Sequence, residues 1–253
     1  MLLAADIGNT NVTLGAFEGA RLVRQWRLAT DPGRTADEYG SEVLSFWERT
    51  FPGRRPEAFV YGSVVPKLDH VFETLSRKYL GLRPRAVGAR SRLGIRIKVD
   101  KPSEVGADRV LNALAAHRLY GGPAIVLDFG TATTFDCVSA RGDYLGGAIL
   151  IGPRLAAEAL ARATAKLPEV EIVPTRRVIG KNTVECIQAG LYYGYLGMVR
   201  LVLEKSIKEM GRPRAKVIAT GGLARLFAKD LGKVRMAEDL TLQGLRLAYE
   251  TFS

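Results

Sequence analysis

The chain has 253 residues and a formal net charge of +11, from 37 Lys and Arg against 26 Asp and Glu. Hydrophobic residues make up 47% of it and charged residues 25%, values typical of a folded protein and not of a disordered or fibrous one. The length allows one large domain or two smaller ones, each with a core. Two cysteines, Cys137 and Cys186, cannot form a disulfide framework, and only two histidines are present, which argues against a zinc enzyme.

The N-terminus and the charge pattern indicate where the protein is located and which partners it lacks. Asp6 interrupts the first apolar run before a signal-peptide core forms, and no apolar stretch reaches the ~18 residues of a membrane span. We therefore expect a cytoplasmic protein without a membrane partner. The basic residues occur in short pairs such as Arg54-Arg55, which are typical of a solvated surface, so we do not expect nucleic acid as a partner. A positive field also helps to recruit an anionic small substrate.

The first half of the chain predicts a strand meander and then alternating helices and strands. Apolar or alternating runs predict strands at 2–7, 12–17 and 22–28. Thr35 and Glu38 form a capping box at the start of a helix. We expect the following elements next: a strand at 58–65, a helix at 68–80, a short strand at 95–99 and a helix at 104–120.

The second half repeats this order. We expect strands at 124–129, 133–138 and 144–151, helices at 155–164 and 183–210, a strand at 217–220 and a last helix at 240–252. The two halves also share an Asp-x-Gly core, at Asp6 and at Asp128, which stand 128 − 6 = 122 residues apart. The sequence therefore predicts two similar α/β domains, residues 1–120 and 121–253, that face each other across a cleft.

Three short segments have the composition of a nucleotide site. The first is Asp6-Ile7-Gly8-Asn9-Thr10-Asn11, where Gly8 allows close approach of backbone amides and small polar side chains offer donors to phosphate. Alone, such a segment is more often a plain hairpin turn. Its second copy, from Asp128 to Thr134, favours function, because two matching loops suit two ends of one phosphate chain. The third segment, Thr220-Gly221-Gly222, permits close packing against a nucleotide, although a helix-start turn explains it equally well.

In this order the three segments resemble the phosphate-1, phosphate-2 and adenosine motifs of the acetate kinase, sugar kinase, Hsp70 and actin superfamily. The other common kinase motifs, G-x-x-x-x-G-K-[ST] and G-x-G-x-x-G, are absent from the sequence. The resemblance implies an α/β fold of two duplicated ribonuclease H-like domains, the actin-like ATPase fold.

The block Glu104-Val105-Gly106-Ala107-Asp108-Arg109 sharpens the resemblance. Together with the flanking motifs, it looks like the type III pantothenate kinase family over essentially the whole chain. The resemblance implies ATP-dependent phosphorylation of pantothenate to 4'-phosphopantothenate, the first step of coenzyme A biosynthesis. It also implies a cytosolic homodimer that uses Mg²⁺ and a monovalent cation, K⁺ or NH₄⁺. In place of a tyrosine that the family often has before Pro102, this chain has Val99.

The resemblance assigns roles to individual residues. Asp108 is implied as the catalytic base, and Arg109 beside it as a partner for the anionic substrate. Asp128 is implied as the monovalent-cation ligand, while Asp6, at the end of a strand, could hold Mg²⁺. The substrate-binding set is Gly106, Ala107, Asp108, Arg109 and Thr183. The ATP-binding set is Asp6, Ile7, Gly8, Asn9, Thr10, Asn11, Val12, Thr13, Thr131, Gly221 and Gly222.

Plainer interpretations stand beside several of these roles. Asp108 and Arg109 could be ordinary residues of a helix, Asp128 a turn-initiating cap, and Thr183 the N-cap of the helix that follows. Tyr192, Tyr193 and Tyr195 are predicted to be packing residues. For the whole chain, two alternatives to pantothenate kinase are a kinase of another small hydroxyl compound and a non-catalytic accessory factor for transcription.

Overall fold

A computed structural model of the protein describes residues 1–212 and 214–252, and the chain divides into two compact units. The first unit consists of Met1–Arg118 and the C-terminal segment from Asp239, and the second unit is Leu119–Glu238. The sequence predicted a boundary after residue 120 and a last helix in the second domain. The structure instead groups this helix with the first unit, because its apolar side packs on the first sheet and on a helix of that unit.

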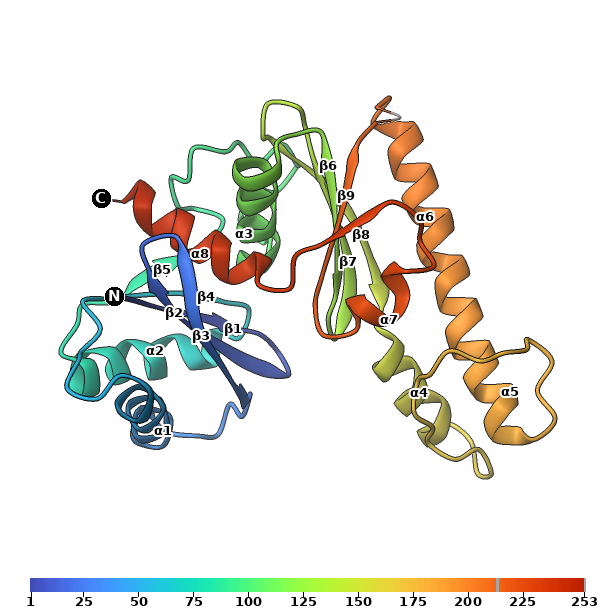
Figure 1. The fold of residues 1–253 in the computed structure, drawn as a ribbon, viewed down its shortest axis with the longest axis horizontal. Helices are drawn as coiled ribbons and strands as arrows, with labels where there is room; N and C mark the ends of the chain where they lie inside the picture. The colour runs from blue at the N-terminus through green and yellow to red at the C-terminus, as the bar shows by residue number, and fades with distance from the viewer. Residues whose placement is uncertain (213, 253) are drawn as a thin grey trace. The chain divides into compact units, whose positions relative to one another are not determined.

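The first unit is a five-stranded sheet covered by helices on both faces (Figure 1). Its strands run in the order β3-β2-β1-β4-β5, with β1 antiparallel to β2 and parallel to β4. The strands are β1 (Leu2–Ile7), β2 (Asn11–Glu18), β3 (Arg21–Ala29), β4 (Ala58–Ser63) and β5 (Arg85–Val87). The helices are α1 (Ala36–Thr50), α2 (Pro66–Leu75) with a π-helical turn at Ser76–Leu80, a 3-10 turn at Pro102–Glu104, α3 (Ala107–Ala115) with a π-helical turn at Ala116–Tyr120, and α8 (Leu240–Thr251).

Side chains along β1 point alternately to the two faces of this sheet, and different helices cover each face. Leu3, Ala5 and Ile7 point into a core that includes the buried side chains of α1 and α2. The intervening residues, which include Asp6, therefore point to the other face, where α8 contacts β1 and α3 contacts β4. The capping box of Thr35 and Glu38 is present at the start of α1, as predicted.

The second unit repeats the topology of the first. Its sheet has the order β10-β9-β6-β7-β8, with β6 antiparallel to β7 and parallel to β9, so β6 occupies the place of β1. The strands are β6 (Ala124–Phe129), β7 (Ala132–Val138), β8 (Tyr144–Ile151), β9 (Lys216–Thr220) and β10 (Val234–Met236). The helices are α4 (Pro153–Arg162), α5 (Thr183–Ala189), a π-helical turn at Gly190–Gly194, α6 (Tyr195–Glu209) and α7 (Ala224–Ala228). The predicted duplication is confirmed.

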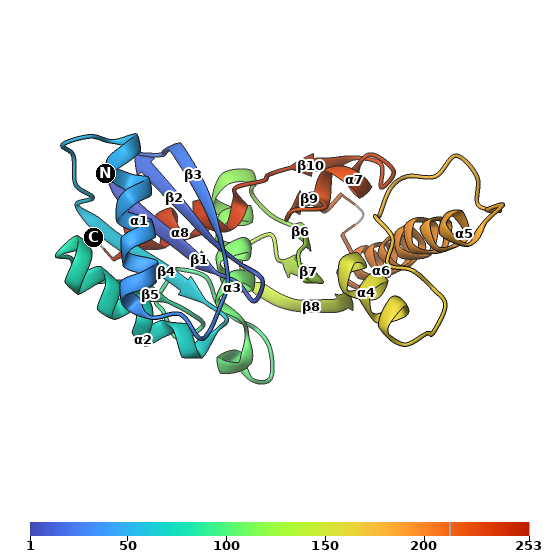
Figure 2. The same cartoon turned by 90° about the horizontal axis from the view of Figure 1, so that it is seen from below.

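One predicted strand is wrong, and one observed strand was not predicted. The segment 95–99 is not a strand but has only an isolated bridge at Ile97, and the edge of the first sheet is formed by Arg85–Val87. At the corresponding edge of the second sheet, Val234–Met236 is a strand that the sequence did not predict. Both edge strands have three residues, too few for an alternating pattern to be recognised. The predicted helix 183–210 is confirmed: α5, the π turn and α6 form one continuous helical segment (Figure 2).

Candidate active site

The first predicted phosphate loop joins β1 to β2. Its Gly8 amide donates to the Asn11 carbonyl oxygen at 3.0 Å. Thr30, just beyond β3, holds the loop from outside, because its hydroxyl donates to the Gly8 carbonyl at 2.6 Å and its amide donates to the Thr10 carbonyl at 2.9 Å. The side chains of Asn9 and Thr10 are exposed. The loop is thus fixed in place while it presents small polar groups outward, as phosphate binding requires.

The structure brings the start of α3 next to Asp6. On the neighbouring strand β4, Gly62 lies directly beside Asp6 in the parallel register. A Cβ atom on Gly62 would lie 2.8 Å from Leu111 Cδ1 and 3.6 Å from Ala107 Cβ, so α3 packs closely over this glycine. Neighbouring residues on adjacent strands point to the same face of a sheet. Asp6 and the residues that begin α3 therefore share one face of the first unit.

Asp108 is the second residue of α3 and is half-buried. Its Oδ1 accepts a hydrogen bond from the backbone amide of Arg109 at 2.8 Å. Burial raises the pKa of Asp108 above its ordinary value, although the Arg109 amide and charge oppose this shift. A raised pKa makes the carboxylate a better proton acceptor, which suits a general base.

A cavity of about 800 Å³ adjoins the start of α3 within the first unit. It opens among the ends of β4 and β5, the start of α2 and the segment that leads into α3. The lining residues are Ser63, Val64, Pro66, Asp69, Gly88, Ala89, Arg90, Ser91, Ser103, Glu104, Val105, Gly106 and Ala107. Asp108 follows this lining directly in sequence. The cavity has the size of a small-molecule site, and the sequence did not predict its wall between Gly88 and Ser91.

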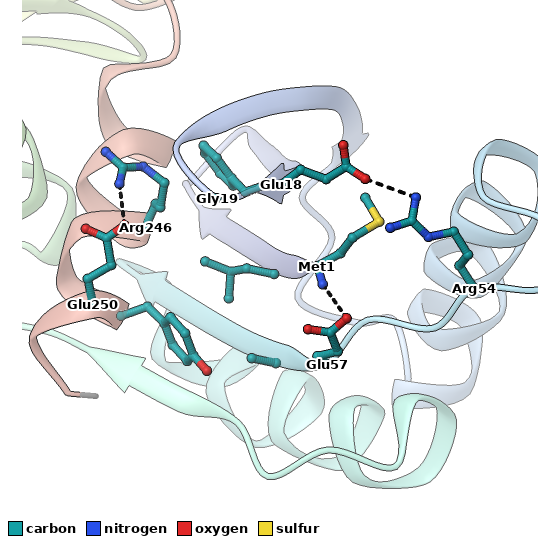
Figure 3. Close-up of a pocket in the computed structure, with 11 residues that line it drawn as sticks. Met1, Glu18, Gly19, Arg54, Glu57, Arg246 and Glu250 are labelled. Carbon is teal, nitrogen blue, oxygen red and sulfur yellow. Dashed lines mark hydrogen bonds and ion pairs between the residues drawn. The ribbon is translucent and has the colours of Figure 1, made fainter.

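A second cavity of the first unit, of about 400 Å³, lies at the opposite end of β1, beside Met1 and Leu2 (Figure 3). Its charged groups are all in ion pairs. Glu18 pairs with Arg54 at 3.0 Å, the N-terminal amine pairs with Glu57 at 2.8 Å, and Arg246 pairs with Glu250 at 2.5 Å. It contains none of the predicted site residues, so we do not assign the substrate to it.

The second predicted phosphate loop joins β6 to β7 and contacts the predicted adenosine motif. Its Gly130 amide donates to the Ala132 carbonyl at 3.1 Å, as Gly8 does to Asn11 in the first loop. Gly221 has a φ of +90°, and a Cβ atom there would lie 2.6 Å from Asp128 Oδ1 and from the backbone of Phe129. Only glycine fits this backbone and this spacing. The structure thus brings Asp128 and Gly221 together.

Tyr195 lies behind this loop, at the start of α6. Its hydroxyl forms a hydrogen bond with the buried hydroxyl of Thr133, and the charge of Asp128 is close enough to act on it. Burial is the largest cause of the raised pKa of Tyr195, followed among the raising effects by Asp128. The ring also packs against Phe129 and Phe227. Packing was the predicted role of Tyr195, and this hydrogen bond behind Asp128 is a feature that sequence reasoning missed.

The donor types in the second loop suit a hard cation but do not make a closed metal cage. Asp128 offers a carboxylate, and Thr131 adds a hydroxyl from the same loop. Among the described residues no three His, Cys, Asp or Glu side chains gather in a metal-binding group. Within residues 1–212 and 214–252, no helix is both long and apolar enough to cross a lipid bilayer. A magnesium ion bound by one carboxylate and by substrate phosphates is compatible with this sparse donor set.

Thr183 is not brought to the second loop. It is exposed at the first position of α5, 12 residues before Tyr195, or about 18 Å along a helix. It is not the N-cap either. Asn182 is, because its Oδ1 accepts from the Glu185 amide at 2.9 Å.

Comparison with known proteins identifies the family of the chain. A family model described as type III pantothenate kinase matches residues 2–205. The type III pantothenate kinase of Moorella thermoacetica is 47% identical over 252 residues, which cover 99% of each chain.

Two solved structures show the fold alone, each at 16% identity. A protein of Campylobacter jejuni assigned to the Baf family of transcriptional activators has a TM-score of 0.63, with 99% of this chain and 98% of that one covered. The ROK hexokinase of Thermus thermophilus has a TM-score of 0.56 at the same coverage. The fold is that of the two-domain actin-like ATPases. By its full-length identity and its family model, the chain belongs to the type III pantothenate kinases, which phosphorylate pantothenate in coenzyme A biosynthesis.

Proposed function

We propose that the chain transfers the γ-phosphoryl group of ATP to the 4'-hydroxyl of pantothenate, with Asp108 as the base. The observation that carries this assignment is the packing of α3 over Gly62, beside Asp6 on the same face of the sheet. It joins a carboxylate of raised pKa to a loop suited to phosphate. The cavity beside Gly106 and Ala107 then holds pantothenate.

The transfer of the phosphoryl group needs no reactant other than ATP, the pantothenate hydroxyl and Asp108. The hydroxyl oxygen forms a bond to the γ-phosphorus, the bond between that phosphorus and the bridging oxygen of ADP breaks, and the hydroxyl proton passes to Asp108. Such reactions depend mainly on position and charge, so the proton can leave late. Arg109 stabilises the anionic substrate by its charge. After release of products, Asp108 returns its proton to water.

We assign the rest of the nucleotide to residues of both loops. The first loop, with Ile7, Val12 and Thr13 at its base, binds phosphate through backbone groups, since the Ile7 and Val12 side chains are buried. Thr131, Gly221 and Gly222 contact ATP from the second loop. Asp6 would hold Mg²⁺, and Asp128 a monovalent cation, K⁺ or NH₄⁺. When bound, these ions neutralise phosphate charge.

We also propose that the protein is a cytoplasmic homodimer and that β8 takes part in the interface. This strand lies at an edge of its sheet, and its outward row is apolar. Ile149 is 62% exposed and Ile151 is 44% exposed, and Leu155 of α4 next in sequence is 43% exposed. An uncovered apolar edge strand is an aggregation hazard unless a partner covers it. We also propose Thr183, which is exposed on α5, as a substrate contact.

Release of ADP from ATP tests the proposal. We expect turnover that depends on pantothenate and Mg²⁺ and that falls when K⁺ is replaced by Na⁺. Turnover without this difference would remove the role of Asp128 and leave the kinase assignment in place. Turnover with other hydroxyl compounds and none with pantothenate would contradict the proposed substrate.

A further inference from the structure

The residue that follows β3, Thr30, closes the first phosphate loop through two contacts. Its hydroxyl donates to the Gly8 carbonyl at 2.6 Å, and its amide donates to the Thr10 carbonyl at 2.9 Å. These two carbonyl groups lie on either side of Asn9 in the sequence. One residue from outside the loop therefore fixes the backbone on both sides of its tip.

The contact with Gly8 also orients the amide of Asn9. A peptide unit is planar and trans, so its carbonyl and its N–H point in opposite directions. Because the Gly8 carbonyl is turned toward Thr30, the Asn9 N–H points away from Thr30. No acceptor in the described part of the chain takes this N–H, and Asn9 is exposed. The loop thus presents an oriented donor of the kind that a phosphate oxygen accepts.

The second loop has the amide contact but lacks the hydroxyl contact. Gly152 follows β8 as Thr30 follows β3, and its amide donates to the Thr131 carbonyl at 3.1 Å. A Cβ atom on Gly152 would overlap that same carbonyl oxygen, so a residue with a side chain does not fit there. Of the two loops, only the first is held by a side chain of the third strand's end. This contact is therefore not a necessary part of the repeated topology.

Tyr39 of α1 holds the segment that carries Thr30. Its ring is buried in the core of the first unit. Its hydroxyl accepts a hydrogen bond from the Asp31 amide at 2.9 Å and lies 3.3 Å from the carbonyl oxygens of Ala29 and Asp31. Because Ala29 and Asp31 flank Thr30, the core fixes the backbone from which Thr30 reaches the loop.

We propose that Thr30 is a positioning residue for ATP. Its hydroxyl keeps the first loop in the conformation that binds phosphate, and Tyr39 acts through Thr30. The inference rests on the proposed function only where that function assigns this loop to the phosphates of ATP, and it does not depend on which hydroxyl compound is phosphorylated. Without the hydroxyl, ATP must order the Gly8 peptide as it binds, which weakens its binding.

Thr30→Val tests this role, because valine keeps the branched shape and the backbone amide but lacks the hydroxyl. We expect KM for ATP and the dissociation constant of the ATP analogue AMPPNP each to rise about fivefold, as for the loss of one hydrogen bond. KM for pantothenate should stay within about twofold. Thr30→Ser keeps the hydroxyl and should return both nucleotide constants to within about twofold of the wild type.

Tyr39→Phe tests the support behind Thr30. It removes the hydroxyl and keeps the buried ring, so we expect both nucleotide constants to rise about twofold to threefold. The double variant Thr30→Val/Tyr39→Phe should bind AMPPNP no more weakly than Thr30→Val, because Tyr39 acts through Thr30. Effects that multiply in the double variant would overturn this part of the proposal.

Thr50→Val is the matched control. The Thr50 hydroxyl also donates to a backbone carbonyl of the first unit, that of Phe46 at 2.8 Å, in the last turn of α1. Its loss should leave both nucleotide constants within about twofold of the wild type.

Two results would overturn the role of Thr30. One is a Thr30→Val protein that binds AMPPNP as tightly as the wild type. The other is an equal weakening in Thr50→Val, which would indicate a general loss of stability. A wild type that binds AMPPNP but releases no ADP with pantothenate would instead contradict the proposed function, and the binding comparison would still decide the role of Thr30.

Discussion

Replacement of Gly244 by alanine should disturb the active site from the last helix of the chain. Gly244 of α8 packs on α3, where an added Cβ would lie 2.4 Å from the Leu111 carbonyl oxygen and 2.8 Å from its carbonyl carbon. An unstrained carbon-to-oxygen contact is about 3.3 Å, so the helices must separate by about 0.9 Å. No change of rotamer relieves the contact, because it involves the backbone of Leu111.

The expected cost follows from this displacement. Overpacking of a tight interface typically costs about 1–3 kcal/mol, against which alanine in a helix gains about 1 kcal/mol over glycine. We expect a net loss of about 0–2 kcal/mol in the free energy of unfolding. Asp108 lies one turn before Leu111 on α3, so the carboxylate moves with the helix. A displacement near 1 Å can reduce kcat about 10²-fold.

Urea unfolding and steady-state kinetics measure both effects. Gly197→Ala is the matched control, because Gly197 lies on an exposed part of α6 and nothing is within 4 Å of its added Cβ. It should leave kcat unchanged and gain up to about 1 kcal/mol. A Gly244→Ala protein with the stability and kcat of the wild type would refute the reasoning that α8 sets the position of α3.

Three further substitutions test other parts of the account. Thr241→Val removes the hydroxyl that donates to the buried Asn112 Oδ1 at 2.8 Å, so we expect urea unfolding to show a loss of about 1–2 kcal/mol in the free energy of unfolding. Thr241→Ser should recover this loss. An unchanged free energy of unfolding in Thr241→Val would show that this bond does not stabilise the contact between α3 and α8. Gly221→Ala forces a side chain against Asp128 at a φ of +90° and should raise KM for ATP at least about tenfold, whereas an unchanged KM would remove Gly221 from the nucleotide site. Ile149→Glu should yield a monomer in light scattering if β8 lies in a dimer interface, and a dimer of wild-type affinity would exclude that face.

Much of the fold is encoded in local patterns that can be read directly. The buried strands at the centre of each sheet are long apolar runs, and the Asp-x-Gly repeat reveals the duplication. The capping box at Thr35 fixes the start of α1. The edge strand Arg85–Val87 is different, because it is three residues long and lies in a basic segment whose strand pairing depends on β4. A pattern of that length has no period that identifies it.

The candidate site was predictable where chemistry depends on residue type and not where it depends on packing. Asp6 and Asp128 stand in a repeated Asp-x-Gly motif, and Asp108 stands in a block that the resemblance to the family singled out. The assignment of α8 to the first unit could not be read in this way, because a helix of this composition fits either half. The hydrogen bonds of Tyr195 to Thr133 and of Thr30 to Gly8 also depend on contacts between segments distant in sequence.

As the proposed catalytic base, Asp108 costs the fold some stability through its place in α3. Burial raises its pKa in the folded state, so the folded state binds the proton more tightly than the unfolded one. Its effect on stability is therefore unfavourable above the raised pKa and diminishes as pH falls through it. Catalysis has the opposite dependence, because the base must be ionised, so kcat/KM should fall at acidic pH.

The most direct test measures turnover and urea unfolding of Asp108→Asn and of the wild type at neutral pH. The account predicts a loss of at least about 10²-fold in pantothenate-dependent ADP release, with a free energy of unfolding equal to or above that of the wild type. Asp100→Asn, an exposed residue of the same unit, should change neither quantity. Retention of more than about a tenth of the turnover would contradict the role of Asp108 as the base. Loss of both turnover and stability would instead make Asp108 a structural residue of α3.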